Sequence, residues 1–187
     1  MYNCWWNYTD FNYSYAIRLS GDDMTTSKCI VEDRVVRLTD TKKGIDKRVK
    51  TRVITTEDFF INNLGHREIL HRNVHPIATV LTKEGAEKNN IKIEDEDDNY
   101  DCEDDNYDCL VFIREKFKSI MTEDEVNALI FHELAHFVLG HGNITGEEEH
   151  KRQERKVEEA IGKENNVILE LLNQRLIYTF PEEFFRY

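Results

Sequence analysis

The run HELAHFVLGH, residues 132–141, holds the side chains of this chain that are best suited to chemistry. His132 and His136 are four residues apart, so on a helix they project within about 40° of each other. Two imidazole nitrogens placed in this way can reach one metal ion at about 2 Å each. The spacing therefore predicts that His132 and His136 are ligands of one metal ion.

Glu133 has a different geometry because it follows His132 directly in the sequence. On a helix its side chain is rotated by about 100° from that of His132, too far to bind the same ion. It can instead contact a water molecule bound to that ion. A carboxylate in this position can take a proton from the water and later deliver it to a leaving amine. We therefore predict that Glu133 is the catalytic base.

The segment that carries these residues has the signals of a capped helix. Thr122 with Glu125 three residues later forms a capping box, and Gly140 is a typical C-terminal stop, so the helix should run from residue 123 to Leu139. Its apolar stripe lies away from the histidines and consists of Val126, Ile130, Leu134 and Phe137. A metal-lined cleft needs a helix that packs through its apolar stripe on one side and presents the two histidines on the other. The alternative is that two histidines lie one turn apart by chance and are structural.

A catalytic zinc site needs a third protein ligand. His141, five residues after His136 and beyond Gly140, is the first candidate; we read it as a turn residue that could also line the cleft. The next helical segment, EEEHKRQERKVEEAIGKEN, supplies two glutamates: Glu154 lies about 60° and Glu158 about 100° from the centre of its apolar face. We prefer Glu158 as the ligand, leaving Glu154 open; the other of the two could orient a ligand. Either could instead be an exposed salt-bridge partner of Lys151, Arg152 or Arg155.

The elements before this helix read as strands and short helices. YAIRL, KCIVEDRVVRLT, KRVKTRVITT and IATVLT have the composition of half-buried strands, and CLVFIRE suggests an edge strand. Thr56 begins a predicted short helix that ends at Gly65. The second long helix should run from near Glu147 towards Arg175, with a possible break at Gly162. The fold class predicted is α+β, in a single domain over residues 1–187.

Within that domain three parts differ in character. Residues 1–93 are the strands and short helices, residues 94–109 are an acidic segment, and residues 110–187 carry the histidine and glutamate helices. The acidic segment repeats EDDNYDC in tandem and is too polar for a core element. A solvated loop is the simpler interpretation; a cation or partner site is the other.

The formal net charge of −12 excludes several classes of partner. An acidic surface repels nucleic-acid phosphates and anionic membranes, so we expect neither as a partner. No apolar stretch is long enough for a membrane span, and the N-terminus does not read as a secretory signal. The four cysteines form no CxxC pair. We expect a cytoplasmic protein; the oligomeric state is left open.

The run MTEDEVNALIFHELAHFVLGH resembles the gluzincin branch of zinc metallopeptidases, in particular compact enzymes of the ImmA/IrrE type. VEEAIGKEN approximates their second motif, and the resemblance covers about residues 108–172. It implies a zincin-like core, Zn²⁺ as cofactor, a glutamate ligand on the second helix, and hydrolysis of a protein or peptide substrate. His150 or Tyr178 could supply a further transition-state donor. The rival predictions are a catalytically silent binding module and an acidic decoy of nucleic acid.

Overall fold

The computed structural model describes residues 12–19, 26–40, 45–57, 77–88, 91–95, 107–141 and 147–184. It is α+β, as predicted, and divides into two compact units. Unit 1 comprises residues 1–54 and 81–111, and unit 2 comprises residues 55–80 and 112–187. The predicted helix at 56–65 lies, beyond Glu57, outside the described residues, as does the acidic repeat before Tyr107.

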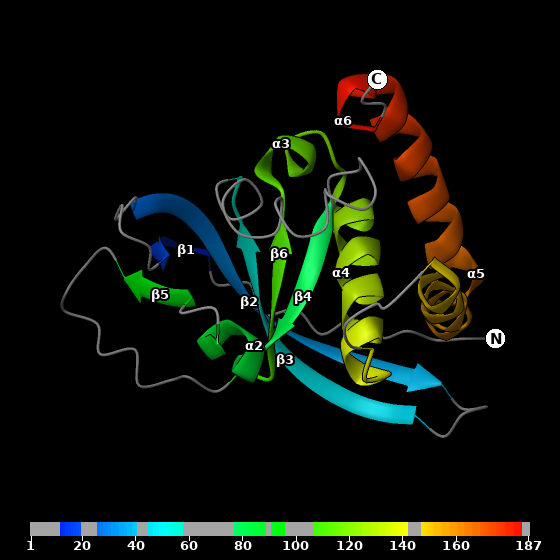
Figure 1. Cartoon of the computed structure of the whole chain (residues 1–187), viewed down its shortest axis with the longest axis horizontal. Coiled ribbons are helices and arrows are strands. Elements are labelled where there is room, and N and C mark those ends of the chain that lie inside the picture. The colour runs from blue at the N-terminus through cyan, green and yellow to red at the C-terminus, as the bar shows by residue number, and fades with distance from the viewer. Residues whose placement is uncertain are drawn as a thin grey trace. The chain divides into compact units, whose positions relative to one another are not determined.

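The strands form one six-stranded sheet in the order β4-β6-β3-β2-β1-β5 (Figure 1). Their bounds are β1 Asn12–Leu19, β2 Thr26–Asp40, β3 Ile45–Thr55, β4 Ala78–Thr82, β5 Ile91–Asp95 and β6 Cys109–Ile113. β1 pairs antiparallel with both β2 and β5, with Tyr15 opposite Cys29 in the first pair and Asp95 in the second. The strands predicted from YAIRL, KCIVEDRVVRLT, KRVKTRVITT and IATVLT are confirmed.

Strand β6 is not the edge strand that the sequence suggested. It lies between β4 and β3, and all five of its residues are buried. A strand covered on both faces needs apolar side chains at every position instead of alternate ones. The continuous run CLVFI meets that requirement, so the prediction of an edge position was wrong.

Helix α4, Glu123–Val138, follows its predicted bounds closely. The Thr122 hydroxyl accepts a hydrogen bond from the Glu125 backbone N–H, while the Glu125 carboxylate accepts one from the Thr122 N–H. This capping box satisfies two donors that the first turn leaves unpaired. At the other end Gly140 has a positive φ of 65°. The buried face is wider than predicted, because Ala128, Leu129, Phe131 and Ala135 are buried together with Val126, Ile130 and Leu134.

Helix α5, Glu147–Thr179, is interrupted at Gly162, where φ is 82° and ψ is 165°. The predicted break is confirmed, and Figure 1 shows the helix changing direction along its length. Two asparagine side chains bind carbonyl groups that the break exposes: Asn165 donates to the Ile161 carbonyl and Asn166 to that of Glu158. The helix thus has a first segment, residues 147–161, and a second segment, residues 163–179.

The second segment of α5 closes a core in unit 2. Leu172 and Leu176 pack against Phe117 of the short helix α3, Glu115–Lys118, and Phe180 and Phe184 join this cluster from the C-terminal end. Phe184 ends α6, Pro181–Phe184. The remaining described helix is α2, Lys83–Lys88, in unit 1. None of the described helices has the length and apolar content that crossing a membrane requires.

Candidate metal centre

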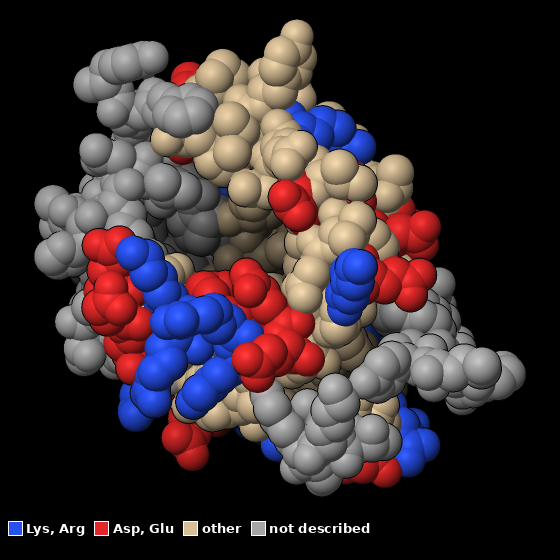
Figure 2. All heavy atoms as spheres, turned by 90° about the vertical axis from the view of Figure 1, so that its right-hand side faces the viewer, with Lys and Arg blue, Asp and Glu red and all other residues tan. Residues whose placement is uncertain are grey.

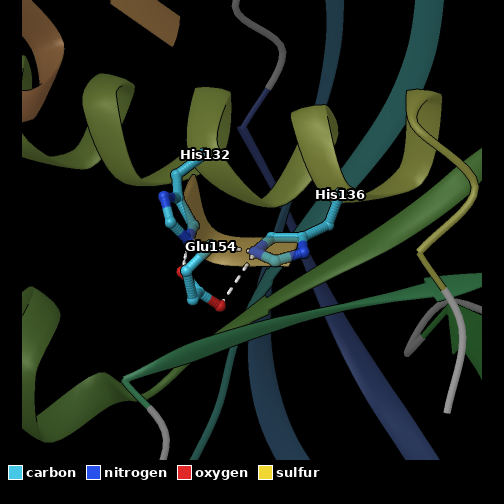
Figure 3. A group of neighbouring side chains, drawn as sticks. All are labelled: His132, His136 and Glu154. Atoms are coloured by element: carbon cyan, nitrogen blue, oxygen red, sulfur yellow. Dashed lines mark hydrogen bonds and ion pairs between the residues drawn. The ribbon is translucent and has the colours of Figure 1, made fainter. Parts of the chain in front are cut away.

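Two helices of unit 2 bring together three side chains that could hold a metal ion. His132 and His136 project from one side of α4, and Glu154 reaches towards them from the first segment of α5 (Figure 3). Figure 3 shows the carboxylate facing one nitrogen of each ring. The three side chains are 19%, 14% and 29% exposed, respectively. The predicted histidine pair therefore faces a neighbouring helix, and its face is neither open solvent nor apolar core.

The three side chains are close enough to share one ion, since one ligand atom from each lies within 4.8 Å of the others. His132 Nε2 and His136 Nε2 are 3.2 Å apart. Glu154 Oε2 is 3.3 Å from His132 Nε2, and Glu154 Oε1 is 3.4 Å from His136 Nε2. Ligand atoms at about 2.0–2.1 Å from a tetrahedral zinc lie about 3.3 Å from one another. Two imidazoles and one carboxylate at these distances could therefore hold one metal ion.

The structure brings Glu154, and not the preferred Glu158, to the two histidines. Glu158 is exposed and lies outside the group of three. The reason is the rotation of α5: Gln153, Val157 and Ile161 are its buried residues in this segment. Glu154 lies about 60° from Val157 around the helix and Glu158 about 100°, so only the nearer carboxylate borders the buried face.

The basic residues proposed as alternative partners of these glutamates bind elsewhere. Lys151 pairs with Glu147 at 2.6 Å and Arg152 pairs with Glu149 at 2.7 Å. Figure 2, which faces the side of the molecule where α5 lies, shows basic side chains among acidic ones. The ion pairs of Lys151 and Arg152 place charges of both signs next to one another along the exposed side of the first segment. Glu154 is turned away from these pairs and towards the histidines.

The turn after α4 places a third histidine next to His136. The Gly140 N–H donates to the Phe137 carbonyl, and the His141 N–H donates to the His136 carbonyl. These two bonds and the positive φ of Gly140 make a Schellman motif. The motif turns the chain back over the last helical turn, and His141 Nδ1 comes to 3.1 Å from His136 Nδ1. His141 is thus a turn residue, as predicted, and it also contacts a member of the group.

The group is strongly coupled electrostatically. Burial raises the pKa of Glu154, but hydrogen bonds from His132 and His136 outweigh it and hold this pKa well below its usual range. Burial lowers the pKa of His132, yet the hydrogen bond to Glu154 and the charges of Glu133 and Glu158 leave it raised. Glu154 is therefore ionised, as a carboxylate ligand must be. A proton on His132 would compete with a metal ion for the same nitrogen.

The two residues predicted as possible transition-state donors, His150 and Tyr178, lie in different places. His150 lies one turn before Glu154, with its Nδ1 3.8 Å from Glu154 Oε1. Tyr178 lies on the second segment of α5 and is 89% exposed. Of the two residues named as possible transition-state donors, His150 is the one beside the group.

Glu133 is half-buried on α4, directly after His132.

The sequence pattern does not by itself predict the contact between His141 and His136. The signal that could have found it is the glycine before His141, because a Schellman motif brings the second residue past the helix back to the last turn. Within the described residues, the Nε2 of His141 and the Nδ1 of His132 are buried and have no hydrogen-bond partner.

Comparison of the chain with protein-family models, with curated proteins and with solved structures finds no match.

Proposed function

We propose that this protein is a zinc-dependent peptidase whose metal ligands are His132, His136 and Glu154. The observation that supports it is the convergence of the three side chains: the two Nε2 atoms lie 3.2 Å apart, and each has one oxygen of the Glu154 carboxylate within 3.4 Å. Two neutral imidazoles and one carboxylate are a common ligand set of catalytic zinc and leave a fourth position for water or substrate. The proposal keeps the predicted histidine pair and replaces Glu158 by Glu154.

In this proposal Zn²⁺ supplies Lewis-acid activation of water and of the peptide carbonyl. Glu133 accepts a proton from the attacking water and passes it to the leaving amine. Its place next to His132 in the sequence keeps it near the ligands, while its rotation of about 100° keeps it out of the ligand set. The carboxylate of Glu154 balances part of the positive charge that the ion brings.

His150 is the proposed donor to the carbonyl oxygen on which charge develops. It is half-buried, 29% exposed at the side chain, and lies one helical turn from Glu154. Hydrogen-bond donors aimed at developing charge lower the barrier because they need no reorganisation during the reaction. Tyr178, at 89% exposure beyond Gly162, is not proposed for this role.

The test of the mechanism is Glu133→Gln, which keeps size and hydrogen bonding but removes the base. We expect cleavage of a mixed library of fluorogenic peptides to fall by about 10²–10⁴-fold, the usual contribution of a general base. Zinc content by elemental analysis and the thermal midpoint should stay unchanged. Glu159→Gln, at an exposed position on α5, is the matched control and should cleave normally.

Three outcomes of this experiment would count against the proposal. If Glu133→Gln cleaves as fast as the unsubstituted chain, the assigned mechanism is wrong. If the unsubstituted chain binds one zinc but cleaves no peptide of the library, the catalytically silent binding module becomes the better proposal. A chain that takes up no zinc at all would leave the histidine pair without a metal-binding role.

A further inference from the structure

We propose that His141 is a positioning residue that accepts a hydrogen bond from His136 Nδ1 and so holds the His136 ring with its Nε2 lone pair towards the metal position. This inference rests on the proposed function, because it assigns a role around the same metal centre. The role differs from that of a simple turn residue, and it also differs from that of a third metal ligand.

The backbone supports this role before any side chain is considered. The His141 N–H donates to the His136 carbonyl at 3.0 Å, so the two residues are tied together at the main chain. Gly140, with φ of 65°, provides the left-handed residue that this turn needs. His141 is therefore presented to His136 by the end of α4 itself, and the approach does not depend on a long flexible side chain.

The side chains meet on the correct side of the His136 ring. Nδ1 of His136 faces His141 at 3.1 Å, while Nε2 of the same ring faces Glu154 at 3.4 Å. The two rings are inclined at 68° with centroids 5.1 Å apart, so they do not stack. A histidine that binds a metal through one nitrogen usually donates its other N–H to an acceptor, which sets its tautomer and orientation. His141 Nδ1 occupies the place of that acceptor.

The proton between the two Nδ1 atoms determines what His136 can do. When His141 holds it, His136 accepts at Nδ1 and carries its own proton on Nε2, which then points at Glu154. When His136 holds it, the Nε2 lone pair of His136 is free to bind a metal ion, and His141 carries its proton on Nε2. Both forms have two neutral rings and the same number of protons. Metal binding therefore exchanges one pair of tautomers for the other.

This exchange adds no unsatisfied buried group. Nε2 of His141 is buried and has no hydrogen-bond partner among the described residues, whichever form it takes. The His136–His141 hydrogen bond is kept in both states, with donor and acceptor reversed. The pair is thus suited to presenting a lone pair to a metal at low cost.

Two substitutions at one position test the inference. His141→Asn keeps a carbonyl acceptor close to the position of Nδ1, whereas His141→Leu removes the acceptor and keeps a side chain of similar size. We expect His141→Leu to weaken zinc binding, measured by competition with a chromophoric chelator, by about 10–100-fold. His141→Asn should restore most of the affinity. Circular dichroism and the thermal midpoint of the zinc-free chains show whether each variant is folded.

A second measurement reads the tautomers directly in the unsubstituted chain. Nitrogen chemical shifts of the histidine rings, recorded with and without zinc, should show the His141 proton on Nδ1 without metal and on Nε2 with metal. A structural histidine that only fills space would keep one tautomer throughout. This measurement needs no variant, so it remains decisive even if His141→Leu fails to fold.

The outcomes separate this inference from the proposed function. Zinc binding that is equal in the unsubstituted chain, His141→Leu and His141→Asn, with an unchanged His141 tautomer, overturns the inference alone. Zinc-dependent tautomers together with undiminished cleavage by Glu133→Gln support the inference and overturn the proposed mechanism. Failure of the unsubstituted chain to bind zinc overturns both.

Discussion

Glu154 and Glu158 lie one turn apart on α5, and the difference between them is one of position and not of chemistry. Glu154 makes ion pairs with His132 and His136, whereas Glu158 is exposed and its carbonyl accepts a hydrogen bond from Asn166. Both carboxylates contribute charge that raises the pKa of His132, but only Glu154 does so through a hydrogen bond. The pair thus offers a test in which each member controls for the other.

At the residue scale we predict that Glu154→Gln removes zinc binding and that Glu158→Gln does not. A neutral amide lacks the charge of a carboxylate ligand, so the affinity for zinc should fall by more than about 100-fold. This loss exceeds the one expected for a residue that only hydrogen-bonds to a metal ligand. Zinc titration of the two variants, with elemental analysis after dialysis, makes the comparison. Retention of one zinc by Glu154→Gln together with its loss from Glu158→Gln would reverse the assignment.

At the element scale, two glycines control how the helices end and bend. Gly140 has φ of 65°, a left-handed conformation that other residues reach at moderate cost, while Gly162 has φ of 82° with ψ of 165°, which is accessible almost only to glycine. A Cβ atom built at either position meets no atom within 4 Å. Any cost of substitution therefore comes from the backbone conformation and not from crowding.

We predict that Gly162→Ala destabilises the protein more than Gly140→Ala does. The expected losses in the free energy of unfolding are about 1–3 kcal/mol for Gly162→Ala and about 1 kcal/mol for Gly140→Ala. Urea denaturation of the zinc-free chains measures both. Because the break separates the segment that carries Glu154 from the one that packs in the core, Gly162→Ala should also weaken zinc binding. Equal stability of the two variants would contradict the assigned backbone strain.

At the scale of the whole molecule, stability in acid depends on carboxylates of unit 2 that bind basic groups. Glu183 pairs with Lys116 at 2.6 Å and with the buried Arg114 at 3.2 Å, and Arg114 also binds Glu57. Burial raises the pKa of Glu183, but the Lys116 hydrogen bond and the charge of Arg114 leave it lowered. Glu125 has a lowered pKa for similar reasons: burial is outweighed by hydrogen bonds from Thr122 and Arg175.

A carboxylate with a lowered pKa in the folded state stabilises the fold above its unfolded pKa of about 4.5. That contribution is lost as the pH falls from about 4.5 through the folded pKa. We predict a falling free energy of unfolding over this range, measured by urea denaturation at several pH values. Glu183→Gln should lose about 1–3 kcal/mol at pH 7 and show a smaller acid dependence. Glu182→Gln, 64% exposed, is the control; an equal effect there would contradict the prediction.

Local features of the sequence were sufficient to predict much of this protein. The bounds of α4, its capping box at Thr122, its stop at Gly140 and the break at Gly162 were all foreseen. Each depends on residues within a few positions of one another, where propensity, capping and backbone sterics act directly. The common direction of His132 and His136 belongs with them, since it follows from helical geometry alone.

Two features were decided only by the tertiary structure. The interior place of β6 depends on pairing with strands distant in the sequence, which a short apolar run does not specify. The approach of Glu154 depends on how α5 is rotated against α4, a property of packing between two helices. The contact of His141 with His136 is local by contrast, because the Schellman motif at Gly140 brings His141 back to the last turn of α4. The sequence alone thus determined which residues can bind a metal, and packing determined which of them meet.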